Sequence, residues 1–237
     1  MRWMIRLVGE STDTEALSQA LSPSGPSRID WELSTRAYYV RSALLDGIGE
    51  PRIAFDKGAE LLGALTASGL VIHGRSLNVR ADGLGCENPG CPFDQFVFPE
   101  SIPWLDPSVA KTSKRTATIV TMEEAAELAL KNPSVAKALR IFGSDRSWVG
   151  LYKVFELIRA DVGDSMFALN WTTKTEVRRF THTANSPAAS RDEARHGVLS
   201  GYPPAVPMKR DDAAQLIERL LQQWLEHLTQ YTRASRS

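Results

Sequence analysis

The chain has few residues of the kinds that mark secreted or membrane-bound proteins. Only two of its 237 residues are cysteines, Cys86 and Cys91, which is too few for a disulfide-stapled secreted domain and fits a reducing compartment. No apolar run is long enough to cross a bilayer, and the apolar stretch near the N-terminus is broken by Arg6 and Glu10, unlike a signal peptide. We therefore expect a cytoplasmic protein without a membrane partner.

The chain also lacks net charge, because 28 Lys and Arg residues balance 28 Asp and Glu residues. No overall field attracts such a protein to nucleic acid, so any contact with RNA must come from a local patch. Glycine-rich phosphate loops, nucleophile elbows and the His-Glu-x-x-His zinc motif are absent from the sequence. Nucleotide hydrolysis and zinc peptidase chemistry therefore have no support.

Residues 1–105 are expected to form a small mixed α/β domain. Strand-forming residues predict strands at 3–8, at 29–42 as one bent strand or two, at 70–73 and 76–80 as a hairpin or a strand that runs into a turn, and at 95–98. Apolar spacing predicts helices at 11–22, with Ser11 or Thr12 as the cap, and at 55–67. Asp56 is the expected cap of the second helix and Gly69 its expected end.

Residues 119–237 are expected to form an α-helical bundle, joined to the first domain by a proline-containing linker at 106–118. Apolar residues recur every three or four positions in most of this half, which is typical of amphipathic helices. The predicted helices are 123–131, one that starts at Asn132-Pro133 and ends at 142, 148–162, about 174–184, and a long final helix that starts near 211. The predicted fold class is therefore α+β, a mixed α/β domain followed by a helical bundle.

Two local signals support these helices. Thr121 and Glu124 form a capping-box pattern, in which each side chain accepts a hydrogen bond from a backbone N–H at the helix start. Trp148, Tyr152 and Phe155 lie on one apolar stripe, so we expect them in the core rather than stacked on bases.

Residues 185–208 are predicted to be an irregular loop, bounded by prolines, that carries a short helix at about 190–195 ended by Gly197. With the helix before it, this loop holds a cluster of basic residues: Arg178, Arg179, His182, Arg191, Arg195 and His196. A polar segment outside the hydrophobic stripes displays side chains for contact.

Arg191, Asp192 and His196 are the candidate catalytic residues. An imidazole that titrates near neutral pH can transfer protons to and from a ribose hydroxyl, and a guanidinium can stabilise the charge that develops on phosphate oxygens. Residues five apart on a helix project about 140° from each other, so these two reach one groove only if it wraps the helix or a second protomer completes it.

This segment resembles the Arg-x4-6-His motif of the HEPN superfamily, in which a polar residue commonly follows the arginine, as Asp192 does here. The resemblance implies a dimerising helical bundle, a composite active site at the dimer interface, and metal-independent RNA cleavage through the 2′-hydroxyl, of a bacterial defence or toxin type. It also implies that Arg191 stabilises the transition state, that His196 is the general acid or base, and that Asp192 orients them. No metal or other cofactor is implied.

The neighbouring basic residues are predicted to contact RNA phosphates. Arg178 and His182 are four apart and share a helix face, and Arg179 and Arg195 add to the local positive charge. The alternative is that all of these residues form an ordinary solvated surface. In that case the protein is a non-catalytic interaction or structural protein that uses 174–208 to bind a partner.

Cys86 and Cys91 are separated by four residues in a segment rich in glycine and proline. A zinc site would need two further ligands, and His73 is the only histidine nearby in the sequence. A plain loop with two thiols, or a redox-sensitive pair, is the other interpretation.

Overall fold

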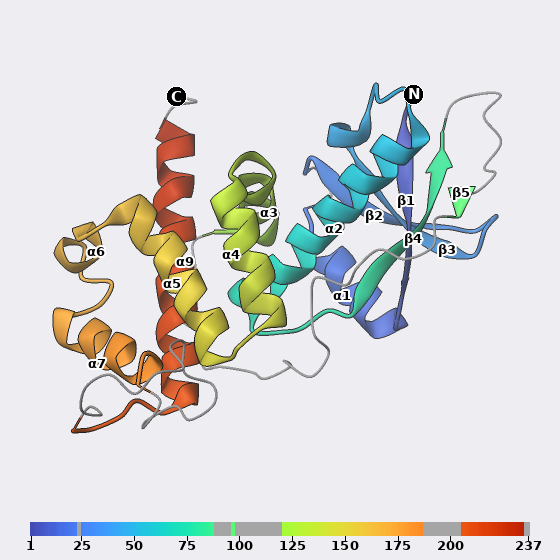
Figure 1. The fold of residues 1–237 in the computed structure, drawn as a ribbon. Coiled ribbons are helices and arrows are strands. Elements are labelled where there is room, and N and C mark those ends of the chain that lie inside the picture. Colours follow the sequence, from blue (N-terminus) through green and yellow to red (C-terminus); the bar gives the residue numbers. More distant parts are fainter. Residues whose placement is uncertain (23–24, 88–95, 98–119, 187–204, 235–237) are drawn as a thin grey trace.

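The computed structural model describes residues 1–22, 25–87, 120–186 and 205–234, and the backbone of 96–97. Figure 1 shows a sheet part, which carries the N-terminus, beside a helical part, which carries the C-terminus. The predicted α+β class is therefore confirmed.

The sheet part contains five antiparallel strands in the order β2-β3-β1-β4-β5. The strands are β1 (Trp3–Gly9), β2 (Ser27–Glu32), β3 (Ala37–Ser42), β4 (Val79–Cys86) and β5 (Phe96–Val97). Helix α1 (Ser11–Ala20) connects β1 to β2, and α2 (Pro51–His73) connects β3 to β4 after a short 3-10 turn at Ala43–Leu45. This succession is the split β-α-β arrangement, in which β1 lies between β3 and β4.

Strand β1 shows why the sheet folds against the helices. Trp3, Ile5 and Leu7 alternate along the strand and are all buried, as expected for the side of a sheet that packs on a core. Ile5 lies directly against Gly58 of α2. Figure 1 shows α1 and α2 on the side of the sheet that faces the helical part.

Helix α2 corrects the prediction for residues 55–80. It runs for 23 residues and ends at His73, where Gly74 adopts a left-handed conformation with φ of 63°. The predicted end at Gly69 and the predicted hairpin strand at 70–73 were wrong, because all residues from 61 to 72 are buried and this part of the helix is enclosed on every side. Asp56 is not the cap; it lies inside the helix and pairs with Arg52.

The helical part consists of helices that the sequence mostly predicted. They are α3 (Met122–Lys131), α4 (Pro133–Ser144), α5 (Trp148–Val162), α6 (Ser165–Ala168), α7 (Lys174–Ala184) and α9 (Arg210–Ala234). The capping box of Thr121 and Glu124 is present, with hydrogen bonds in both directions. The Ser147 hydroxyl caps α5 by accepting a 3.2 Å hydrogen bond from the Gly150 N–H.

One hydrophobic core joins the two parts. Buried side chains of the sheet, of α2 and of the helical part form a single cluster. Helix α2 contacts β4 and β1 on one side and α3, α4 and α9 on the other. Its Val71 carbonyl also accepts a 2.7 Å hydrogen bond from Gln222 of α9. The predicted linker at 106–118 lies outside the described residues, so the domain boundary stays a prediction.

None of the described helices is both long and apolar enough to span a membrane.

Candidate functional site

Four of the predicted site residues, Arg191, Asp192, Arg195 and His196, lie outside the described residues. The structure does describe both flanks of the segment 187–204 that carries them. These flanks are α7 with the two residues that follow it, Asn185 and Ser186, and the stretch 205–208 before α9.

The folding of α7 follows from its sequence. The Thr173 hydroxyl accepts a hydrogen bond from the Glu176 N–H at 3.1 Å and so begins the helix. Phe180 is fully buried on the inner face, where its ring packs against three aromatic rings of α5. Those rings belong to Trp148, Tyr152 and Phe155, which lie in the core as predicted, Tyr152 only half-buried.

The C-terminal half of α7 anchors both flanks of the segment. On one side, Arg179 donates from Nε to the Val206 carbonyl and from an NH2 group to the Pro207 carbonyl, each at 3.0 Å. Next to them, the Met208 N–H donates to the Thr183 hydroxyl at 3.0 Å. On the other side, the Ser186 N–H donates to the Thr183 carbonyl at 3.2 Å. The backbone on both flanks of the segment therefore forms hydrogen bonds with the same residue of α7, Thr183.

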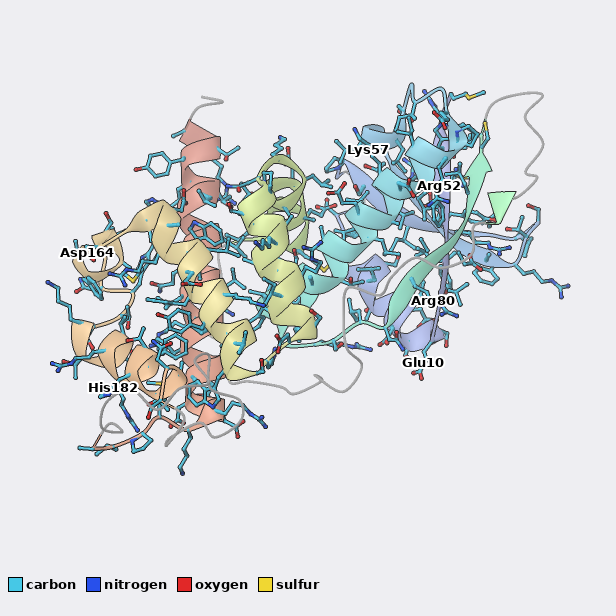
Figure 2. The ribbon with its side chains drawn as sticks, in the orientation of Figure 1. Glu10, Arg52, Lys57, Arg80, Asp164 and His182 are labelled. Carbon is cyan, nitrogen blue, oxygen red and sulfur yellow. The ribbon has the colours of Figure 1, made fainter. Side chains whose placement is uncertain are left out.

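These contacts separate the predicted phosphate-binding residues into two groups. The Arg179 guanidinium is engaged by backbone carbonyls of the returning chain, so it holds the fold of this region. Arg178 and His182 are exposed on α7, and His182 projects from the helix in Figure 2. Two of the predicted phosphate-binding residues, Arg178 and His182, are thus exposed on α7, whereas Arg179 has a structural role.

Lys174 extends that surface. Lys174, Arg178 and His182 follow one another at intervals of four residues, and all three are exposed. At a rise of 1.5 Å per residue they are spaced about 6 Å apart along the helix. We call these three residues the α7 ridge.

Acidic groups beside the ridge are compensated from within the protein. Glu176 accepts a hydrogen bond from the Thr172 hydroxyl and forms an ion pair with Arg219 of α9, both at 2.8 Å. The Glu176 carboxylate is therefore not a free negative charge that would repel an anion on the ridge.

Deeper in the helical part, burial lowers the pKa of Arg146, although the nearby charge of Glu218 acts in the opposite direction.

The structure describes only one of the two cysteines that the zinc-site interpretation requires. Cys86 is a buried free thiol at the end of β4, and Cys91 lies outside the described residues. Among the residues that the structure describes, no three His, Cys, Asp or Glu side chains gather as a metal site would require.

The sheet part carries two hollows that the sequence did not indicate. One, of about 280 Å³, lies beside Arg2, Arg28 and Arg41. The other, of about 490 Å³, lies beside Trp31 and Tyr38. The partial alternation of 29–42 predicts the strands that carry these residues, but not which aromatic ring remains open to solvent.

Comparison with protein-family models, with curated proteins and with solved structures gave no match to this chain.

Proposed function

We propose that the protein is a metal-independent ribonuclease in which segment 187–204 supplies the reacting groups and the α7 ridge binds the RNA backbone. The observation that carries the proposal is the anchoring of both flanks of this segment on α7, the helix that presents Arg178 and His182 to solvent. A catalytic segment tied to a basic helix would deliver its side chains beside a bound phosphate chain.

The reaction follows from the residue types. The 2′-hydroxyl of a nucleotide attacks the adjacent phosphorus, the bond to the 5′-oxygen breaks, and a 2′,3′-cyclic phosphate and a 5′-hydroxyl result. His196 would act as general acid or base in these proton transfers, Arg191 would stabilise the charge on the phosphoryl oxygens, and Asp192 would orient them. A second protomer would complete the groove, so the proposal includes a homodimer.

The test is RNA cleavage in EDTA by the full chain, with mass spectrometry of the product ends. His196→Ala and Arg191→Ala should each lower the rate by about 100-fold or more while leaving the circular dichroism spectrum unchanged. Intact RNA after incubation with wild type, or cleavage by both variants at the wild-type rate, would refute the proposal and favour a protein that binds a partner through 174–208.

The α7 ridge is tested separately by binding. Arg178→Ala should weaken binding of single-stranded RNA and reduce its dependence on salt concentration, because one phosphate contact is lost. Lys57→Ala is the matched control: Lys57 is exposed on α2 and lies far from His182 in Figure 2. Equal effects of the two substitutions would mean that the ridge contributes only general charge.

A further inference from the structure

The larger hollow of the sheet part lies where two strands separate. The register of β1 and β3 ends at the pair Leu7–Tyr38, and β1 then continues beside β4 alone, through Val8 and Gly9. The hollow of about 490 Å³ opens at this point, between the end of β1, the start of α1 and the β2–β3 hairpin. We call it the β1–β3 notch. In Figure 2 the label Glu10 marks the residue that follows β1 and precedes α1.

An aromatic pair forms one wall of the notch. Trp31 and Tyr38 face each other across β2 and β3, with ring centroids 4.8 Å apart and an angle of 64° between the rings. Trp31 nevertheless remains 51% exposed. Its indole therefore offers an open face that is held in place by the edge-to-face contact with Tyr38. Such a platform is suited to stacking with another planar ring.

The charges around the notch favour an anion near the hairpin. Arg6 and Asp82 both line it, but they neutralise each other through two parallel hydrogen bonds of 2.8 Å. Arg36 also lines the notch, is exposed, and makes no hydrogen bond or ion pair with the part of the chain that the structure describes. Arg36 is thus the cation available to a ligand, and the Asp82 carboxylate does not oppose its field.

The β2–β3 turn brings the platform and the cation into one hollow. Arg36 lies in this turn, where its backbone is left-handed with φ of 51°, and its side chain lines the same hollow as Trp31. Ser11, at the start of α1, adds a hydroxyl and the partial positive charge of a helix N-terminus to the opposite wall. An apolar ligand would use the indole alone and leave these polar groups without partners.

We infer that the β1–β3 notch binds a nucleotide, with its base stacked on Trp31 and its phosphate on Arg36. The nucleotide is either free or one unit of an RNA strand, and the chemistry of recognition is the same for both. The inference makes no use of Arg191 or His196 and so stands apart from the proposed cleavage.

The test is isothermal titration calorimetry of the full chain with AMP, with adenosine and with a six-residue oligoadenylate. We expect AMP to bind and adenosine to bind more weakly, because adenosine lacks the phosphate. Trp31→Ala should weaken the binding of AMP about tenfold or more. Arg36→Gln should remove the preference for AMP over adenosine. A hexamer that binds more tightly than AMP, and that loses this advantage in Trp31→Ala, identifies an RNA strand as the natural ligand of the notch; a hexamer without such a Trp31-dependent advantage identifies a free nucleotide.

Two further variants keep the test decisive. Trp31→Phe retains an aromatic face and should bind AMP within about threefold of wild type, so it separates stacking from any effect of Trp31→Ala on folding. Leu33→Ala changes the same hairpin at a side chain that is 78% exposed, and it should leave affinity unchanged. His196→Ala should bind AMP as wild type does, whether or not the protein cleaves RNA. Absence of AMP binding at millimolar concentration, or equal affinity of wild type and Trp31→Ala, would overturn the inference.

Discussion

Two glycines of α2 allow the packing of this helix to be tested with the same substitution at two sites. Gly58 and Gly69 both lie inside the helix, where alanine is intrinsically favoured over glycine by about 1 kcal/mol. Their surroundings differ. A Cβ atom at Gly58 would lie 2.2 Å from the Cδ1 and Cγ1 atoms of Ile5. At Gly69 the same atom would lie 3.2 Å from the Met122 sulfur and 3.3 Å from Leu77 Cδ1.

The gain in helix propensity and the cost of packing should therefore combine to net effects on stability of opposite sign at Gly58 and Gly69. Overfilling a packed core costs about 1–3 kcal/mol, so Gly58→Ala should lower the free energy of unfolding by up to about 2 kcal/mol despite its gain in helix propensity. At Gly69, the flexible Met122 side chain can move by the few tenths of an ångström required. Gly69→Ala should therefore leave stability unchanged or raise it by up to about 1 kcal/mol.

Urea unfolding followed by circular dichroism measures both variants, provided that the slope with denaturant stays constant. Ile5→Ala supplies the control, since it removes the atoms that would clash. It should cost less stability in the Gly58→Ala background than in wild type, by about 1 kcal/mol. Equal shifts for Gly58→Ala and Gly69→Ala, or no coupling with Ile5, would refute the account of how α2 packs on the sheet.

Other predictions concern the ends of helices. Thr121→Ala removes the capping box of α3 and should lower the free energy of unfolding by about 1 kcal/mol in the same assay. Burial raises the pKa of Glu124, but hydrogen bonds from Thr121 and Arg233 outweigh it and leave the pKa below 4.5. The ionised Glu124 carboxylate therefore stabilises the folded state above pH 4.5, and this contribution is lost as the pH falls through its lower pKa in the folded protein. Arg233→Ala should reduce this loss in acid titrations of stability. Arg179→Ala frees the Val206 and Pro207 carbonyls and should speed proteolysis at 205–208, whereas Arg178→Ala should not; equal rates would contradict the anchoring role of Arg179.

Local chemistry explains which elements could be predicted from the sequence. Helices α3, α4 and α7 have Thr121, Asn132 and Thr173 as their N-caps, whose side chains accept hydrogen bonds from the first turn. Such signals act over three or four residues, so they can be recognised without knowledge of the fold. The same holds for the aromatic stripe of α5, whose spacing alone predicts burial.

Helix α2 and the candidate site show where this reasoning fails. Gly69 has the appearance of a helix end, but its missing side chain instead makes room for Met122, more than fifty residues later. The role of Arg179 likewise depends on carbonyls 27 and 28 residues away. The openness of Trp31 depends on where β1 and β3 separate. These features arise from tertiary contacts, which no local pattern encodes.

The position of α2 has a consequence for any attempt to divide the molecule. This helix belongs to the first 87 residues of the chain, yet it contacts α3, α4 and α9. A chain cut within 106–118 should consequently remain one particle, with its two pieces held together through α2 and separable only by denaturant. Conversely, residues 119–237 produced alone would present to water the surface that α2 covers, and should aggregate until the N-terminal piece is supplied.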